Sequence, residues 1–347
     1  MKIKKINMVL LIALMLIFNS CGSNPEESTP QVSSLSLGYP SDFPAIIDSG
    51  GQGTGTYIKG FGGDTTTDKS GNQAIISSSG KRVVILIHGN GSSADRTWDN
   101  EVLTGFAYRK GLKDAGYPDA CIWALSYQGH DDYGNREAAT YNGVRANIDD
   151  VRNFINAVIQ YTGVSKVDII AISQGCLMAR GYLLGFQSNG TFNTSDRKFS
   201  QIGSIVLLSA PNYGLGKNVT SGDDYDSDSG LYNLTAANNF NRVDSVTNYT
   251  PNSPTIKYYC IYARYDYPDY CYDTIGQGHP ECINTSRLGS ASYFEIPESY
   301  GANNYYLERD SGAPYYNVYK NYLYQNHIWT LYDESIFTGY VLPNINN

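Results

Sequence analysis

The sequence has little of what marks a nucleic-acid-binding protein or a zinc protein. Its 25 Lys and Arg residues are outnumbered by 33 Asp and Glu residues and form no basic stripe, so we expect no nucleic-acid partner. With four His residues and no C-x2-C pair, we expect no metal site of Cys and His ligands. The 41% hydrophobic content is enough for a sizeable core, which excludes a disordered chain.

The N-terminal apolar run, Met8–Phe18, is too short to cross a membrane. It has 11 residues, whereas a membrane-spanning helix needs about 20. Three lysines precede it, so residues 1–20 are predicted to be a signal peptide. The run is followed by Asn19-Ser20-Cys21, and a small residue before a Cys at this place resembles a bacterial lipoprotein signal. We expect an exported protein anchored to the membrane through lipidated Cys21, with residues 21–47 as a tether; an ordinary secretory signal is the alternative.

Five cysteines follow Cys21, so at least one of them has no disulfide partner within the chain. An exported protein can hold disulfides. Cys271 and Cys282 flank a short loop that contains Gly and Pro, and we expect this pair to be bonded.

Apolar runs of strand length recur along the chain from residue 81 onward. Such runs are typical of strands that are buried on both faces of a parallel sheet. A helix is predicted over residues 144–161, where apolar residues recur at helical spacing before Gly163. This alternation predicts a mostly parallel, doubly wound α/β sheet in one domain, 48–347. Residues 48–80 are expected to form loop with short strands, and residues 212–254, rich in Tyr and Asn, a lid-like insertion. The five runs are 83–87, 121–125, 167–172, 205–208 and 256–263.

Ser173 follows the third apolar run directly and precedes a segment that resembles a helix, 176–184. The sequence around it is Ala171-Ile172-Ser173-Gln174-Gly175, with small residues two positions before and after the serine. This is the pattern of a nucleophile elbow, a strained turn that lifts a serine hydroxyl above the sheet edge. Ser-x-Gly occurs elsewhere in the chain, but only Ser173 has a buried strand before it and a helix after it. An ordinary serine in a strand-to-helix turn is the alternative.

A second motif, Ile87-His88-Gly89-Asn90-Gly91, ends the first apolar run. Together with Gly116-Tyr117 and the stretch from Tyr161 to Gly175, it resembles the α/β-hydrolase lipases. Within them it is most similar to the lipase-like extracellular poly(3-hydroxybutyrate) depolymerases. The resemblance covers roughly residues 83–180 and implies an α/β-hydrolase fold. One difference is Ile172-Ser173-Gln174, where the depolymerases commonly have His-Ser-Met.

The resemblance implies a catalytic triad in the chain order Ser, acid, His. Ser173 would be the nucleophile. His327 lies in a late loop before an apolar closing segment and is favoured as the general base, with His279 as the alternative. Asp266 is the first carboxylate after the fifth apolar run and is favoured as the acid, with Asp269 as the alternative.

The oxyanion hole of such an enzyme is made by backbone N–H groups. Here they would belong to Asn90 and Gln174. His88 lies upstream of the serine, and we interpret it as a residue that orients this turn. No metal and no organic cofactor are implied by this chemistry. The acidic cluster at residues 223–228 lacks the spacing of an EF-hand, so we interpret it as a solvated loop.

These residues predict a serine esterase that hydrolyses hydrophobic carboxylic esters, presented as a polymer surface or as lipid. The substrate is either a polyhydroxyalkanoate polyester or an acylglycerol lipid. A triacylglycerol lipase or carboxylesterase is therefore the alternative to a polyester depolymerase. A non-catalytic binding protein on the same fold is the alternative from another class, because fold does not determine function. The sequence specifies neither acyl-chain length nor oligomeric state.

Overall fold

The computed structural model describes several separate stretches of the chain, all within the unit Ser36–Asn347. The leader, Cys21, the Cys271–Cys282 pair, the acidic cluster and the lid-like insertion lie outside the described residues, so these expectations stay predictions. The described stretches are 38–44, 46, 59–89, 92–101, 106–127, 144–210, 256–263, 302–307 and 329–346.

The strands in these stretches form one seven-stranded sheet of order β1-β3-β2-β4-β5-β6-β7. Every neighbouring pair is parallel except β1 and β3, which are antiparallel. The five predicted strands are confirmed as β2 to β6, whereas β1 and β7 lie at the two edges of the sheet. The bounds are β1 (Lys59–Gly62), β2 (Val83–Ile87), β3 (Ile122–Ser126), β4 (Val167–Ile172), β5 (Ile202–Leu208), β6 (Lys257–Ala263) and β7 (Ala302–Leu307).

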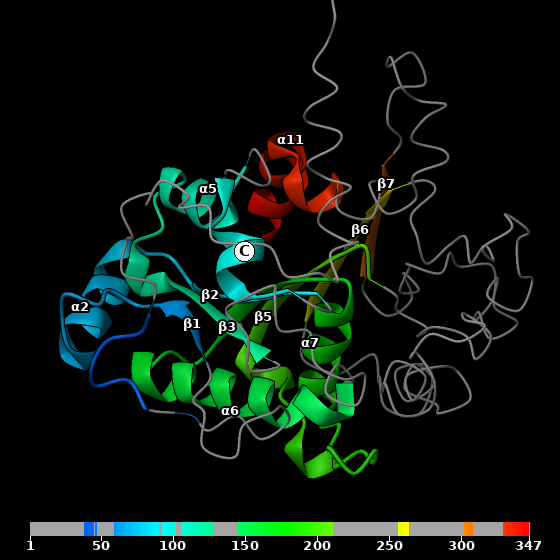
Figure 1. The fold of residues 1–347 in the computed structure, drawn as a ribbon, viewed down its shortest axis with the longest axis horizontal. Coiled ribbons are helices and arrows are strands. Elements are labelled where there is room, and N and C mark those ends of the chain that lie inside the picture. Colours follow the sequence, from blue (N-terminus) through cyan, green and yellow to red (C-terminus); the bar gives the residue numbers. More distant parts are fainter. Residues whose placement is uncertain are drawn as a thin grey trace, which may run out of the picture. The chain divides into compact units, whose positions relative to one another are not determined.

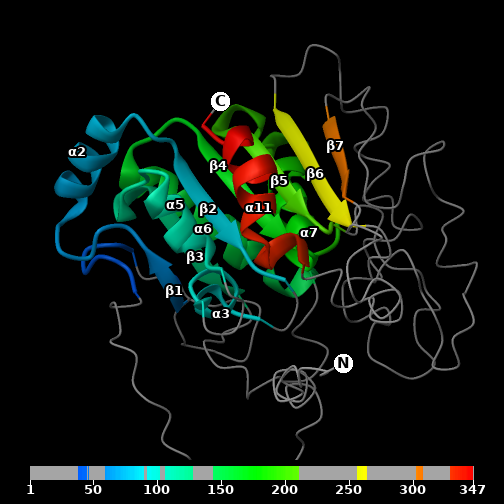
Figure 2. The same cartoon turned by 90° about the horizontal axis from the view of Figure 1, so that it is seen from above.

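Helices cover both faces of this sheet. Figure 1 shows α6 and α7 on one face and α5 and α11 on the other, and Figure 2 shows the same arrangement from above. The predicted doubly wound α/β architecture is therefore confirmed. No helix of the described stretches combines the length and the apolar character that crossing a membrane requires. The bounds are α2 (Lys69–Ser79), α3 (Ala94–Trp98), α5 (Tyr108–Asp114), η1 (Asp119–Cys121), α6 (Val144–Thr162), α7 (Gln174–Leu184), η4 (Thr194–Asp196), η5 (Phe199–Gln201), α11 (Glu334–Ile336), η10 (Phe337–Val341) and η11 (Leu342–Asn344).

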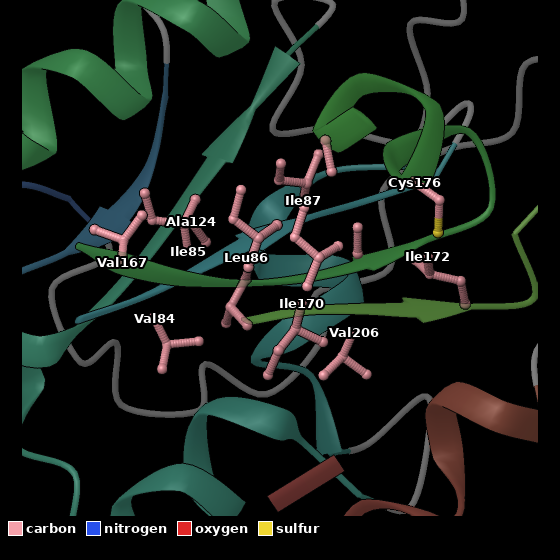
Figure 3. Close-up of a cluster of buried hydrophobic side chains, with 14 of the residues drawn as sticks. Val84, Ile85, Leu86, Ile87, Ala124, Val167, Ile170, Ile172, Cys176 and Val206 are labelled. Atoms are coloured by element: carbon pink, nitrogen blue, oxygen red, sulfur yellow. The ribbon is translucent and has the colours of Figure 1, made fainter. Parts of the chain in front are cut away.

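The core is centred on the middle strands of the sheet. Every side chain of β2 and β4 is buried, as expected for parallel strands that are covered on both faces. Figure 3 shows side chains of β2, β4 and β5 gathered in one cluster, together with Cys176 from α7. Full burial of each such aliphatic side chain contributes roughly 1.5–3 kcal/mol relative to exposure. This packing fixes the strands whose ends carry the candidate site.

The helix predicted over residues 144–161 is confirmed as α6, which ends one residue later. The expectation of loop with short strands over 48–80 is wrong for α2. Its sequence, KSGNQAIISSS, has too few apolar residues to show a helical period. The helix is set by its ends instead: the Asp68 carboxylate caps it by accepting from the Gly71 N–H at 2.9 Å. Burial of Asn72 and Ile76 then holds one face against the domain.

Packing against the sheet begins within the segment that the sequence assigned to the tether. The Tyr39 ring stacks on Trp123, with ring centroids 6.2 Å apart. Its hydroxyl donates to the Ala124 carbonyl of β3 at 2.9 Å. Phe43 is buried against the same tryptophan, with centroids 5.0 Å apart. Residues 38–44 therefore contribute to the core of the domain.

Asp168 is a buried carboxylate near the start of β4, at the end opposite Ser173. Its Oδ1 accepts from Arg82 Nη1 at 2.7 Å and from the Ser204 N–H at 2.8 Å. Its Oδ2 accepts from the Asn346 N–H at 2.7 Å. Burial raises the pKa of Asp168, although these donors oppose the shift. The carboxylate thus ties β4 to β5 and to the C-terminal segment.

Asp168→Asn is expected to lower the free energy of unfolding by about 1–3 kcal/mol. Both carboxylate oxygens of Asp168 accept hydrogen bonds, whereas the NH2 group of an asparagine in its place would face an N–H donor and could not accept from it. Denaturation followed by circular dichroism at pH 7 measures this. Asp114→Asn, on the exposed pair with Lys110, is the control and should change stability by less than about 0.5 kcal/mol. Since the folded-state pKa is raised, the stability that Asp168 contributes is greatest below about pH 4 and decreases as pH rises through that pKa. Equal stability of wild type and Asp168→Asn would contradict this role.

Candidate active site

The carboxyl ends of the parallel strands meet at one edge of the sheet. His88 and Gly89 follow β2, Tyr127 follows β3, Ser173 follows β4 and Ser209 follows β5. Ligands of open α/β sheets bind in the crevice outside these strand ends. Those residues of the predicted site that the structure describes therefore lie at the edge of the sheet where α/β folds bind their ligands.

Ser173 has a strained backbone between β4 and α7. Its φ of 55° and ψ of −126° lie in a region that residues other than glycine rarely adopt. Its N–H donates to the Leu208 carbonyl of β5 at 3.0 Å, which pins the turn. Ser173 is partly exposed, whereas Ile172 and Gln174 on either side are buried. The predicted strand–turn–helix geometry is confirmed; the role of Ser173 as nucleophile stays a prediction.

The small residues around Ser173 are required by close backbone approach. A Cβ at position 175 would collide with the carbonyl oxygens of Ile87 and His88. A Cβ at position 89 would lie 3.1 Å from the Ser173 Cβ. Glycine at both positions lets the start of α7 and the turn after β2 pack against each other. Gly89 is thereby brought directly beside the candidate nucleophile.

His88, for which an orienting role is predicted, is fully buried. Its ring stacks on Tyr127, with centroids 4.0 Å apart and planes 3° apart. The Tyr127 hydroxyl donates to the His88 carbonyl at 2.7 Å and lies 3.4 Å from Gln174 Oε1. Burial raises the pKa of Tyr127 well above its ordinary value, so the phenol stays a hydrogen-bond donor.

A helical turn over residues 329–332 is held at the same sheet edge. The Thr330 hydroxyl lies 2.9 Å from the Ser209 hydroxyl at the end of β5. The Thr330 carbonyl accepts from the Tyr108 hydroxyl of α5 at 3.4 Å. Trp329 Nε1 donates to Asp333 Oδ2 at 2.7 Å, which closes the turn. The chain that follows His327 is thus fixed next to the strand neighbouring β4.

The structure brings together Ser173, Gln174 and the His88–Gly89 turn. The other predicted site residues lie outside the described stretches: Asn90, Asp266, Asp269, His279 and His327. Sequence reasoning missed Tyr127; its signal is an aromatic hydroxyl placed directly after a strand at the carboxyl edge. In the stretches that the structure describes, no group of three or more His, Cys, Asp and Glu residues could hold a metal ion.

A mostly parallel sheet with helices on both faces, and a strained serine between a central strand and a helix, define an α/β-hydrolase fold. The profile of the family described as "Lipase (class 2)" matches residues 81–260, slightly more than half of the chain. The chain therefore belongs to the class 2 lipase family. The matched range contains Ser173 and the sequence His88-Gly89-Asn90, and it ends before Asp266.

Solved lipase and esterase structures are similar to the chain at low identity. Lipase B of Aspergillus fumigatus is 18% identical with a TM-score of 0.37; the match covers 66% of this chain and 45% of that lipase. The mature lipase BlEst2 of Bacillus licheniformis is 15% identical with a TM-score of 0.39, covering 70% and 92%. Carboxylesterase CesB of Bacillus subtilis is 13% identical with a TM-score of 0.37, covering 76% and 83%. None of the curated proteins compared with the chain matches its sequence.

Proposed function

We propose that this protein is an exported serine esterase that hydrolyses hydrophobic carboxylic esters through an acyl-enzyme on Ser173. The observation that carries the proposal is the strained backbone of Ser173, partly exposed between two buried neighbours at the carboxyl edge of the sheet. Strain of this kind is retained where it serves a site, since it costs of order 1–3 kcal/mol. Export is predicted from the leader and Cys21 alone.

The oxyanion hole of the proposed enzyme has Gln174 and Asn90 as its donors. Gln174 is the first residue of α7 and directly follows Ser173, so its N–H lies at the N-terminal end of the helix. The positive end of the helix dipole adds to the attraction for a developing anion. Asn90 follows Gly89, which lies beside Ser173. Both donors thus belong to segments that contact the serine.

Chain connectivity supports His327 as the base. His327 precedes Thr330 by three residues, and Thr330 is bonded to Ser209 at the sheet edge. At no more than about 3.6 Å per residue, the Cα of His327 lies within roughly 11 Å of the Thr330 Cα. His279 is 16 residues past Ala263, the end of β6, so no comparable limit holds for it.

The same limit supports Asp266 as the acid. It follows Ala263 by three residues, and β6 runs parallel to β5, which runs parallel to β4. The end of β6 therefore points to the edge that carries Ser173. Asp269 follows Ala263 by six residues, so the limit on the distance between its Cα and the Ala263 Cα is twice as large. An aspartate in this role holds the imidazole in the required tautomer and stabilises the imidazolium that forms.

The reaction then runs in two halves. His327 takes the proton of the Ser173 hydroxyl as its oxygen bonds to the ester carbonyl carbon, and the Gln174 and Asn90 N–H groups hold the negative oxygen. The bond from the carbonyl carbon to the alkoxide oxygen then breaks, and His327 gives its proton to the departing alkoxide. The alkoxide leaves as an alcohol, and the acyl group stays bonded to the Ser173 oxygen. Water, deprotonated by His327, attacks the acyl carbon, and the acid is released as Ser173 recovers its proton.

Acylglycerol lipid is the substrate that membership in a lipase family favours; a hydroxyalkanoate polyester is favoured by the sequence of residues 161–175. We expect the wild-type protein to hydrolyse p-nitrophenyl butyrate and triolein. Titration of the released acid, in the presence of a chelator, measures the hydrolysis of these two esters. The same titration measures the hydrolysis of dispersed poly(3-hydroxybutyrate). Hydrolysis of the polymer without hydrolysis of triolein would assign the polyester instead. No hydrolysis of any of the three would contradict the proposal.

A further inference from the structure

Tyr127 connects the two segments that the proposed oxyanion hole uses. Its hydroxyl donates to the His88 carbonyl at 2.7 Å, in the turn that leads to Asn90. The same hydroxyl lies 3.4 Å from the side-chain oxygen of Gln174, the residue that supplies the other N–H. A phenol has one proton to donate, and the nearer acceptor takes it. The Gln174 side chain thus contacts the Tyr127 hydroxyl, and the direction of that O–H bond is set by the His88 carbonyl.

His88 transmits this contact to the peptide that carries the Asn90 N–H. His88 Nδ1 lies 2.7 Å from the Gly89 carbonyl oxygen. A carbonyl only accepts, so Nδ1 must hold the proton of this bond. The Gly89 carbonyl and the Asn90 N–H belong to one planar peptide, in which a trans bond directs them oppositely. Holding the oxygen therefore sets the direction of the N–H, and polarising the carbonyl makes that N–H a stronger donor.

The Tyr127 ring holds His88 in the orientation that this bond needs. The two rings are stacked with their planes 3° apart, and both residues are fully buried. The stacking thus restrains the plane of the imidazole in which Nδ1 meets the Gly89 carbonyl oxygen. The ring and the hydroxyl of Tyr127 thus act on the same turn from two sides.

We infer that Tyr127 is a positioning residue for the oxyanion hole, fixing the Gly89–Asn90 peptide through His88 and contacting the side chain of Gln174. The inference rests on the proposed serine esterase mechanism. Charge develops on the carbonyl oxygen only as the tetrahedral species forms, so a misplaced donor lowers kcat and leaves ground-state binding nearly unchanged. Tyr127 contacts no substrate atom in this account.

The test compares Tyr127→Phe with Tyr182→Phe. Tyr182 is also fully buried and lies near the C-terminal end of α7, away from Ser173. Its hydroxyl lies 3.1 Å from Asn156 Oδ1 and 3.0 Å from Gln201 Oε1. We expect Tyr127→Phe to lower kcat for p-nitrophenyl butyrate about 10-fold, less than the 100-fold or more for loss of an oxyanion donor, with KM changed less than twofold. A trifluoromethyl ketone, which forms a tetrahedral adduct with the serine, should bind more weakly by the same factor. Tyr182→Phe should leave kcat within twofold of wild type.

A second pair of variants decides the matter if Tyr127→Phe does not fold. His88→Asn keeps an N–H donor for the Gly89 carbonyl and should retain more kcat than His88→Leu, which has none. Equal kcat and ketone affinity in Tyr127→Phe and Tyr182→Phe, or equal losses in the two His88 variants, would overturn the inference while a Ser173-dependent wild-type rate left the esterase standing. A wild type without Ser173-dependent hydrolysis would remove both.

Discussion

Replacing Ser173 with alanine is expected to lower kcat for p-nitrophenyl butyrate by roughly 10⁴-fold or more, equivalent to at least about 5.4 kcal/mol of activation free energy. The hydroxyl oxygen is the only atom that bonds to the substrate carbonyl in the proposed reaction. Without it the two N–H groups can still polarise the ester, but no acyl-enzyme forms and water must attack the ester in place of the serine. KM should change little, since the hydroxyl contributes little to ground-state binding. Initial rates over a range of ester concentrations measure both parameters.

Ser209→Ala is the matched control for this change. Ser209 also ends a parallel strand at the same edge and also has a positive φ, of 46°. Its hydroxyl, however, is buried and pairs with Thr330. We expect its replacement to cost no more than about 10-fold, through loosening of the chain after His327. A Ser173→Ala enzyme that hydrolyses the ester at the rate of Ser209→Ala would show that Ser173 is not the nucleophile.

His327→Ala is expected to lower kcat by roughly 10⁴-fold as well, because a serine hydroxyl is a weak nucleophile unless a base takes its proton. His279→Ala should remain within about threefold of wild type. The same kinetic assay, with folding of each variant checked by circular dichroism, separates the two candidates. A large loss in His279→Ala together with a small loss in His327→Ala would transfer the role of base to His279.

The central strands and α6 could be predicted from the sequence because their apolar residues recur at the period of the element. Burial on both faces makes β2 a continuous apolar run and leaves β4 apolar except for Asp168, and α6 has one apolar stripe. Elements at the periphery of the fold were harder to predict. β7, ANNYYL, was missed because among the described strands it borders only β6, and only some of its described side chains are buried. α2 was expected as loop because its sequence shows no helical period, and the burial of Asn72 and Ile76 depends on tertiary contacts.

The Ser173 turn could be predicted because close backbone approach favours small residues at fixed positions, Ala171 and Gly175, between a strand and a helix. The contacts that support this turn and the neighbouring strand ends could not be predicted from the sequence. Tyr127 and His88 are 39 positions apart, and only the parallel pairing of β2 with β3 brings their rings together. Thr330 and Ser209 are 121 positions apart, and only the folded chain brings the helical turn at 329–332 to the end of β5. Such contacts leave no local pattern in the sequence.

The central claim is that Ser173 becomes acylated, and covalent labelling tests it most directly. The wild-type protein would be treated with a fluorophosphonate, which phosphonylates an activated serine hydroxyl with loss of fluoride. Peptide mass spectrometry then locates the adduct. The account predicts one adduct, on the peptide that contains Ser173, appearing in step with loss of ester hydrolysis and absent from Ser173→Ala. An adduct on another residue, or an unlabelled Ser173 in protein that hydrolyses the ester, would contradict it.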